Sequence, residues 1–422
     1  AICSASIANS RQPIRHRLAE TPVPTSSAGS PSPDCAPMDR RSVTSNPIRL
    51  DSLTGLRWWA AFAVFMGHMR NLAPIPGTFE IFQFGNYGVM FFFILSGFVL
   101  TWSATKPVPV STFYVRRFAR IWPAAFVTLL LALPVFYSFS PDPEQTWVKP
   151  VNVGILLLSI PLLQGWFRDP VILFSGNPAT WTLTIEFFFY SLHPFINRAL
   201  QRLTKRAILI SAGSVVALAF VYRWLLYAVP TLPFALLPLP VLRLNEFILG
   251  MLVASAMRLG WRPRVPMSLL LALLAALVLL SRAGIKGSID PNLATFVAAT
   301  TNEWLLAIFT LMIVSAAARE LGGKKSAFSW WPIVKLGEWS FAFYLVHATL
   351  IYAARGEFGA HGSWGSLLWY PPLLLASIGL AALVHLWVEK PMERKIRYAW
   401  DARRAERPAP APNAVEAGLP GR

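Results

Sequence analysis

Apolar runs of about 20 residues recur along the chain, and short polar segments separate them. An α-helix needs a run of this length to cross the roughly 30 Å hydrocarbon core of a bilayer. Strands of a membrane barrel would alternate in polarity, and these runs do not. The pattern therefore predicts an all-α polytopic membrane protein with about ten transmembrane helices, at 53–72, 86–104, 118–139, 180–200, 207–229, 241–258, 266–283, 297–318, 334–354 and 367–388.

Basic residues between the apolar runs predict the topology. They cluster between alternate runs, and the positive-inside rule places such clusters in the cytoplasm. Both termini are then cytoplasmic, and residues 140–179 begin and end outside. A shorter apolar run at 151–165 contains Pro161 and is expected to lie at the surface or to re-enter the membrane. We accordingly expect a multi-pass protein of the cell membrane.

The composition agrees with a membrane-embedded chain. Of its 422 residues, 55% are hydrophobic and 14% are charged, and the mean hydropathy is +0.49. Soluble domains carry roughly 25% charged residues. The formal net charge of +18 could indicate nucleic-acid binding, but no basic domain with interleaved aromatic residues occurs. We therefore expect a lipid bilayer, and no nucleic acid, as a partner.

The two ends of the chain differ from the apolar middle. Residues 1–48 are rich in Ser, Pro, Ala and Arg, and we expect them to be disordered, like the low-complexity tail at 398–422. The membrane domain is predicted at 49–397. The segment that begins at Met38 reads as an ordinary cytoplasmic leader, so a native start there is a hypothesis.

Three ionisable residues are predicted to lie at one depth in the outer half of the membrane. His68, Glu186 and His347 are about 6, 9 and 10 Å from the outer ends of three different spans, at 1.5 Å per helical residue. Such residues cost roughly 2.5 kcal/mol or more in a span, so they mark a functional site. A carboxylate beside an imidazole favours proton abstraction. The alternative is a hydrogen-bonded pair that holds helices together.

Arginines form a second predicted layer at the cytoplasmic end of the spans. Arg57 and His68 are eleven residues apart, so they share a helix face and lie about 16.5 Å apart along it. Arg117 and Arg120 also share a face, beside Arg116. Guanidinium groups bind phosphates through paired hydrogen bonds, which favours a site for a phosphorylated cytoplasmic donor. The alternative is that these arginines only extend toward the lipid headgroups.

Other polar residues in the spans give weaker signals. We expect Glu246 to pair with Arg243, three residues before it. Glu389 could meet the arginine layer or could simply end the last span, and His385 shows no partner pattern. A metal site is not expected, because no HxxxH or CxxC motif occurs. Nucleotide-binding loops and the GxSxG elbow are also absent from the sequence.

From about residue 50 to 397 the sequence resembles the integral-membrane acyltransferase-3 family of O-acyltransferases. The resemblance rests on an ordered set of segments, each weak alone and specific in combination. These segments are LDSLTGLRWWAAFAVFMGH, GNYGVMFFFILSGFVLT, FYVRRFARIWP, WTLTIEFFFY, EFILGM, FAFYLVH and WVEKP.

The resemblance implies transfer of an acyl group from cytoplasmic acyl-CoA to a hydroxyl group. The acceptor would be a sugar of an envelope glycan or a glycosylated natural product. The family's Arg–ten–His motif matches Arg57 and His68, and its RxxR motif matches Arg117 and Arg120. The glutamate of its WTLxxE-like segment matches Glu186.

The resemblance and the two predicted layers suggest one scheme. The arginines would hold the phosphates of CoA, and the thioester arm would extend into the helix bundle. His68, oriented by Glu186, would take the proton of an acceptor hydroxyl that enters from outside. His347 lies in the same layer and is a further catalytic candidate. The acceptor, the acyl chain length, the oligomeric state and the choice between direct transfer and an acyl-enzyme stay open.

A proton-coupled transporter or flippase is the main alternative, because buried His and Glu also serve proton coupling. The sequence shows none of the internal repeat symmetry found in many transporters. An enzyme that uses a lipid-linked sugar donor is a further alternative. It would usually need a large acidic outer loop, and residues 140–179 contain only Asp142, Glu144 and Asp169 as acidic residues.

Overall fold

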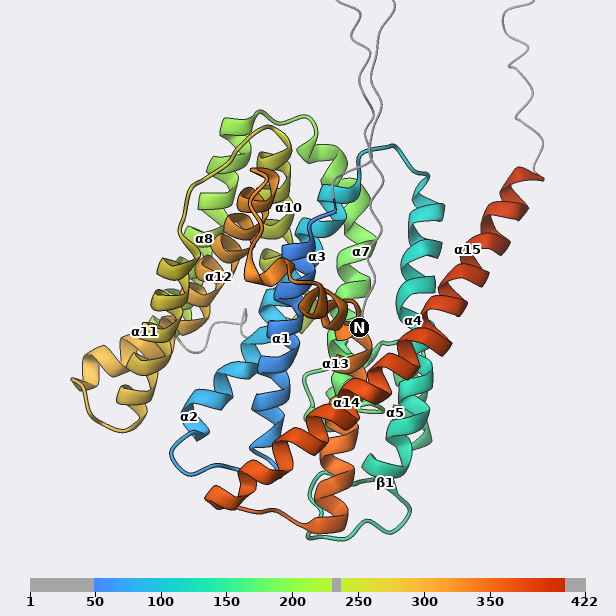
Figure 1. Cartoon of the computed structure of the whole chain (residues 1–422), viewed down its shortest axis with the longest axis vertical. Coiled ribbons are helices and arrows are strands. Elements are labelled where there is room, and N and C mark those ends of the chain that lie inside the picture. The colour runs from blue at the N-terminus through green and yellow to red at the C-terminus, as the bar shows by residue number, and fades with distance from the viewer. Residues whose placement is uncertain (1–48, 230–236, 407–422) are drawn as a thin grey trace, which may run out of the picture. The chain divides into compact units, whose positions relative to one another are not determined.

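The computed structural model describes residues 49–229 and 237–406. The predictions for residues 1–48, including the start at Met38, lie outside the described residues, and so does the tail from 407 onward. The described chain is helical almost throughout (Figure 1). Its two short strands, β1 (Tyr137–Ser138) and β2 (Lys149–Pro150), form a parallel pair. The predicted all-α class is confirmed.

Each predicted span coincides with a long helix. Seven helical segments of the described chain are long and apolar enough to cross a membrane, and they contain α3, α4, α8, α10, α11, α12 and α14. The remaining three helices, α1, α7 and α13, carry candidate polar residues. The ten helices are α1 (Asp51–Met69), α3 (Gly88–Ser103), α4 (Val110–Phe136), α7 (Trp181–Leu200), α8 (Lys205–Ala228), α10 (Leu244–Arg258), α11 (Met267–Ile285), α12 (Pro291–Leu321), α13 (Trp331–Phe358) and α14 (Tyr370–Val384).

Short elements fill the segments between these helices. They are α2 (Phe79–Phe82), η1 (Gln83–Tyr87), α5 (Val153–Ser159), η2 (Gln164–Trp166), α6 (Pro170–Leu173), η3 (Pro178–Thr180), α9 (Leu239–Leu242), η5 (Ala327–Ser329) and η6 (Trp364–Trp369). With 7 residues, α5 is about 10 Å long and cannot cross a bilayer, in agreement with the expectation for 151–165. The end of the 140–179 segment packs into the bundle, because the buried Asn177 donates from Nδ2 to the carbonyl of Leu345 in α13 at 2.8 Å.

The C-terminal helix runs past the expected domain boundary at 397. After α14, one π-helical turn, η7 (His385–Glu389), leads into α15 (Lys390–Ala405), and α14 and α15 form one long rod (Figure 1). Two side chains fasten α15 to α4, since Trp400 Nε1 and Arg404 Nη1 donate to Thr112 Oγ1 at 3.0 and 2.6 Å. These contacts order residues 398–405, which we expected to belong to a disordered tail.

Two pairs of helices set the geometry of the bundle. In the pair α3 and α10, Gly97 lies against the backbone carbonyl of Phe247, and Gly250 lies against that of Ile94. In the pair α1 and α13, the ring of Phe343 packs against Trp58 and Phe65, with ring-centroid distances of 5.1 and 5.9 Å. The second pair brings together the helices that carry His68 and His347.

A carboxylate from α12 caps the first turn of α1. Glu320 accepts hydrogen bonds from the backbone N–H groups of Asp51 and Ser52 at 2.8 and 2.9 Å, and also from the hydroxyl of Ser52. The first N–H groups of a helix have no partner within it, and the helix dipole favours a negative charge there. The contact therefore fixes the position at which α1 begins.

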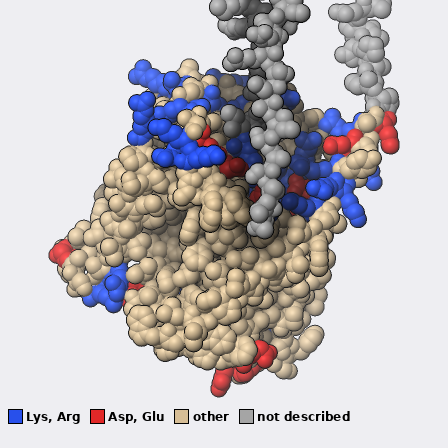
Figure 2. Space-filling view, in the orientation of Figure 1, with Lys and Arg blue, Asp and Glu red and all other residues tan. Residues whose placement is uncertain are grey.

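Charged side chains are concentrated at one end of the bundle (Figure 2). Lys and Arg gather at the end where α15 finishes, while the middle of the visible face is uncharged. This segregation is the pattern from which the topology was predicted. The number of membrane crossings and the side on which each terminus lies stay predictions.

The close contact between α3 and α10 predicts that alanine at one of its glycines destabilises the protein, whereas alanine at an uncrowded glycine does not. In Gly250→Ala the new methyl group would overlap the carbonyl oxygen of Ile94, so the helices must separate, at a cost of about 1–3 kcal/mol. In the control Gly213→Ala on α8, no atom lies within 4 Å of the new methyl group. That control should be neutral or slightly stabilising. The measurement is the thermal midpoint of the detergent-purified variants, and equal midpoints would contradict the packing described.

Candidate active site

Three arginines predicted from the sequence meet in one cavity. Arg57 from α1 and Arg117 and Arg120 from α4 line a cavity of about 140 Å³. Glu186 and Tyr190 from α7 line the same cavity. The structure thus brings the predicted arginine layer together from two helices that are distant in the sequence.

The three arginines differ in their partners. Arg120 is hydrogen-bonded to Glu389, which is 1% exposed, and lies 3.5 Å from Glu393. Within the described part of the chain, neither Arg57 nor Arg117 forms a salt bridge. The Nε atom of Arg117 is buried without a hydrogen-bond partner there, and its guanidinium lies over the ring of Phe113 at 5.9 Å. The cavity therefore contains positive charge that no carboxylate of the described residues pairs.

Glu186 lies in the cavity with the arginines and not against the two histidines. Its Oε2 accepts a hydrogen bond from the hydroxyl of Tyr190 at 2.8 Å. It also lines a smaller cavity of about 60 Å³ together with Arg57, Ser340 and Tyr344. In the described chain no hydrogen bond or ion pair joins Glu186 to His68 or His347. The predicted placement of Glu186 in the histidine layer is therefore corrected.

The depth of α7 explains this correction. The predicted depth of Glu186 assumes that the outer end of α7 lies at the membrane surface. Instead, the hydroxyl of Thr182, in the first turn of α7, contacts the Tyr344 hydroxyl at 3.2 Å, within one turn of His347 on α13. Glu186 follows Thr182 by four residues, which is about 6 Å further along the helix axis.

His68 and His347 form a pair at the other end of α1. Their ring centroids are 5.2 Å apart, and His347 is fully buried. His347 Nδ1 lies 3.1 Å from the carbonyl oxygen of Phe343, so this nitrogen donates the hydrogen bond. The neutral ring then carries its lone pair on Nε2, and this atom has no partner among the described residues. The structure thus brings together two of the three residues that we expected to share one layer.

The chain was also compared with families of known proteins. The model of the acyltransferase domain family matches residues 50–386. The chain is a member of the acyltransferase-3 family. It is therefore an enzyme that transfers acyl groups, as the resemblance of its motifs implied.

Relatives of known activity bear acyltransferase names. Acyltransferase MdmB of Streptomyces mycarofaciens is 34% identical over 397 residues, which cover 88% of this chain and 97% of that protein. The O-acetyltransferase OatA of Staphylococcus aureus is 22% identical over 382 residues, covering 83% of this chain and 58% of that protein. The peptidoglycan O-acetyltransferase OatA of Listeria monocytogenes is 28% identical over 169 residues, covering 37% and 25%. No solved structure matches the chain.

Behind the arginine cavity of this acyltransferase lies a polar chain that was not predicted from the sequence. His385 Nδ1 lies 3.0 Å from Glu389 Oε2, and the other carboxylate oxygen of Glu389 binds Arg120. The π-helical turn that contains both residues is rare in proteins and frequent at functional sites. A spacing of four residues between His and Glu was the available signal. Of the two alternatives for Glu389, the structure shows the contact with the arginine layer. The expected pairing of Glu246 with Arg243 is confirmed, at 2.6 Å.

The buried contact between Arg120 and Glu389 predicts strong energetic coupling. In a double-mutant cycle of Arg120→Gln and Glu389→Gln, we expect a coupling energy of about 0.5–3 kcal/mol, because either single variant leaves a buried group without its partner. The matched control is Arg116 and Asp401, 3.7 Å apart and partly exposed, for which about 0–1 kcal/mol is expected. Thermal or denaturant unfolding of the four acyltransferase variants in each cycle gives both energies. Equal couplings would refute the special role of Glu389.

Proposed function

We propose that this acyltransferase moves an acyl group from cytoplasmic acyl-CoA to a hydroxyl group of a carbohydrate or glycosylated acceptor, with His68 as general base. One observation carries the proposal. The first half of α1 contributes Arg57 to a cavity that contains arginines without a salt bridge in the described chain. The other end of α1 contributes His68 to a histidine pair. The name of the Listeria relative, a peptidoglycan O-acetyltransferase, supports an acceptor of this class.

The arginine cavity suits the phosphate groups of CoA. Guanidinium groups bind phosphate oxygens through two parallel hydrogen bonds. Arg57 and Arg117 have no carboxylate partner in the described chain, so an incoming phosphate would supply the missing negative charge. Arg120 is held from behind by Glu389, which leaves part of its guanidinium facing the cavity. We assign Glu186 to this donor end, because its carboxylate lines the same two cavities as Arg57.

The histidine pair suits proton transfer at the acceptor end. His68 takes the proton of the acceptor hydroxyl, and the oxygen attacks the carbonyl carbon of the thioester. The carbon–sulfur bond then breaks, and the departing CoA thiolate receives the proton from His68. The ring of His347 packs against that of His68, with the ring centroids 5.2 Å apart, and this packing orients the imidazole of His68. No net proton or electron is gained in the transfer.

The distance between the arginine cavity and the histidine pair sets the length that the acyl-CoA donor must span. Arg57 and His68 are eleven residues apart on an uninterrupted helix, about 16.5 Å along its axis. The flexible arm of CoA would cover this distance through the bundle and bring the thioester to His68. The proposal includes ten spans, cytoplasmic termini and a place in the cell membrane, because the basic end of the bundle then faces the CoA pool.

A transporter explains the arginine cavity less well than an acyltransferase does. Relatives that cover most of this chain are named for acyl transfer. Flux of an unmodified solute in proteoliposomes that contain no acyl-CoA would favour transport. Flux that stays at the background of empty liposomes would agree with the proposed enzyme.

His68→Ala should lower the rate of acyl transfer by about 10²–10⁴-fold, the range that general-base catalysis supplies. Binding of CoA to the purified variant should stay unchanged, because the arginine cavity lies at the other end of α1. The control His361→Ala removes a loop histidine that stacks on Trp369 at 5.2 Å and should keep its activity. Transfer of radiolabelled acetyl groups from acetyl-CoA provides the measurement, and a fully active His68→Ala enzyme would remove this residue from the mechanism.

Arg117→Gln combined with Arg120→Gln should raise the KM for acyl-CoA. A lost charge-assisted hydrogen bond is worth about 1.5–3 kcal/mol, which corresponds to a rise of about 10–100-fold. Arg202→Gln, an exposed arginine in the loop between α7 and α8, is the matched control for positive charge. Initial rates against acyl-CoA concentration test the prediction. An unchanged KM in the double variant would show that neither arginine binds the donor and would favour the alternative that both only extend toward the lipid headgroups.

A further inference from the structure

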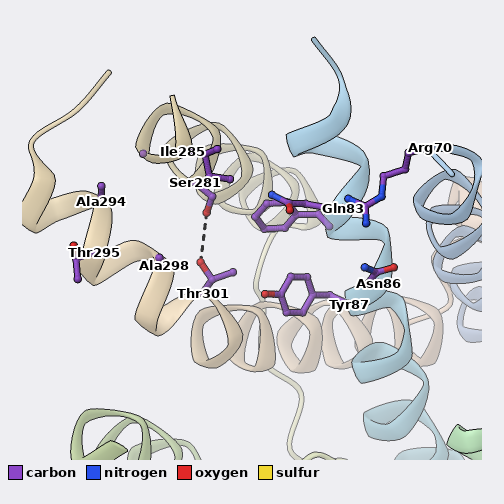
Figure 3. A pocket seen from close by; sticks show the side chains of 12 residues that line it. Arg70, Gln83, Asn86, Tyr87, Ser281, Ile285, Ala294, Thr295, Ala298 and Thr301 are labelled. Atoms are coloured by element: carbon purple, nitrogen blue, oxygen red, sulfur yellow. Dashed lines mark hydrogen bonds between the residues drawn. The ribbon is translucent and has the colours of Figure 1, made fainter. Parts of the chain in front are cut away.

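A second, larger cavity lies apart from the arginine cavity. It has a volume of about 570 Å³, within the range of roughly 300–1,000 Å³ that small-molecule sites occupy. It lies between the segment after α1 and the facing ends of α11 and α12 (Figure 3). Its hydrogen-bonding side chains are Arg70, Gln83, Asn86, Tyr87, Ser281, Thr295 and Thr301.

The cavity adjoins the helix end that carries His68. Arg70, in its wall, follows His68 by two residues. Asn86, also in the wall, is so close to Gly67 that a methyl group on that glycine would lie 3.2 Å from Asn86 Oδ1. The residue before His68 therefore touches the cavity wall, and the cavity lies at the level of the histidine pair.

Much of the hydrogen-bonding capacity in this cavity is unused. Ser281 and Thr301 contact each other at 3.4 Å, as the dashed line in Figure 3 marks. The side chains of Gln83, Asn86 and Tyr87 make no hydrogen bond within the described ranges. Asn86 is exposed in the cavity wall, and Gln83 and Tyr87 are half-buried, so these side chains are open to a ligand that both donates and accepts hydrogen bonds.

The lining also limits the kind of ligand. It contains one positive side chain, Arg70, and no acidic one, so it does not suit a cationic ligand. The guanidinium of Arg70 lies over the ring of Phe79 at 4.5 Å, and its Nε has no partner among the described residues. The small residues Gly284, Ala294 and Ala298 leave room for a rigid ring. Neutral sugar rings combine this size with many hydroxyl groups.

We propose that this cavity binds a neutral, hydroxyl-rich sugar ring of the acceptor and presents it at the outer end of α1. The inference rests on the proposed function, because it assumes that the protein acylates such acceptors. It assigns the recognition of the acceptor to α11, α12 and the segment 70–87. The arginine cavity and the histidine pair then carry out donor binding and catalysis.

Blocking the cavity tests this assignment. Ala298→Phe places a ring in the cavity, and Thr300→Phe adds the same bulk to α12 at a residue outside the lining. With acetyl-CoA and a mixture of methyl hexopyranosides, we expect Ala298→Phe to lose at least about tenfold in acetyl transfer, the effect of losing about 1.4 kcal/mol of binding. Its binding of CoA should stay normal, which shows that the variant is folded. Thr300→Phe should retain its activity.

Chemical protection tests binding without reference to activity. Ala298→Cys and Thr300→Cys, each with Cys3→Ser and Cys35→Ser, are treated with a methanethiosulfonate reagent. The mixture of methyl hexopyranosides at ten times its Kd should slow the labelling of position 298 by about tenfold by mass action. Labelling of position 300 should not change. Cyclohexanol, a ring of similar size with one hydroxyl group, should protect neither position.

The outcomes separate this inference from the proposed function. If the wild-type enzyme acetylates the methyl hexopyranosides but shows neither protection at position 298 nor a defect in Ala298→Phe, the cavity is not the acceptor site and the proposed function stands. If the wild-type enzyme transfers no acetyl group from acetyl-CoA to any of these sugars, the proposed function and this inference both fall.

Discussion

A bilayer offers little water to solvate a charge, so a charge in a membrane-spanning bundle must find its counter-charge within the protein or in a ligand. This constraint acts most strongly on Arg57, Arg117 and Arg120. Only Arg120 has carboxylate partners in the described chain, Glu389 and Glu393. The cavity in front of the other two is consequently suited to an anion, and the rest of the proposed mechanism depends on which anion enters it.

The same constraint explains the support behind the cavity. Glu389 is itself a costly buried charge, and it is stabilised on one side by Arg120 and on the other by His385. The π-helical turn places both His385 and Glu389 on the inner side of the bundle, where each is almost fully buried. Fixed polar groups of this kind hold a binding site in shape before the ligand arrives, which lowers the cost of binding.

The sequence was sufficient to predict the helices and the arginine layer. Apolar runs define spans because length and hydropathy are local properties, and Arg57, Arg117 and Arg120 lie together because each belongs to the same end of its helix. The position of Glu186 could not be predicted in this way. Its depth depends on the segment between α4 and α7, whose Asn177 is buried against α13, and a depth counted along one helix ignores such a contact.

Two further differences between the predictions and the structure also come from contacts between segments that are distant in the sequence. The spacing of His385 and Glu389 indicates that the two can pair, but the contact between Glu389 and Arg120 joins segments 269 residues apart, and no local pattern predicts it. The ordering of residues 398–405 comes from Trp400 and Arg404, which hold Thr112 of α4 from nearly three hundred residues away in the sequence. The composition of residues 398–422 suggested a disordered tail. Composition describes only the residues of a segment and contains no information about the surface against which the segment packs.

The capping of α1 by Glu320 has a mechanical consequence. Glu320 lies near the end of α12, and Thr295 and Thr301, in the first part of the same helix, line the cavity of about 570 Å³. At 31 residues, α12 is a strut about 46 Å long. Any sliding of this strut along its axis would shift the anchor of α1 and the cavity wall in the same direction and by the same amount. The anchor of α1 and the wall of this cavity therefore belong to one continuous helix.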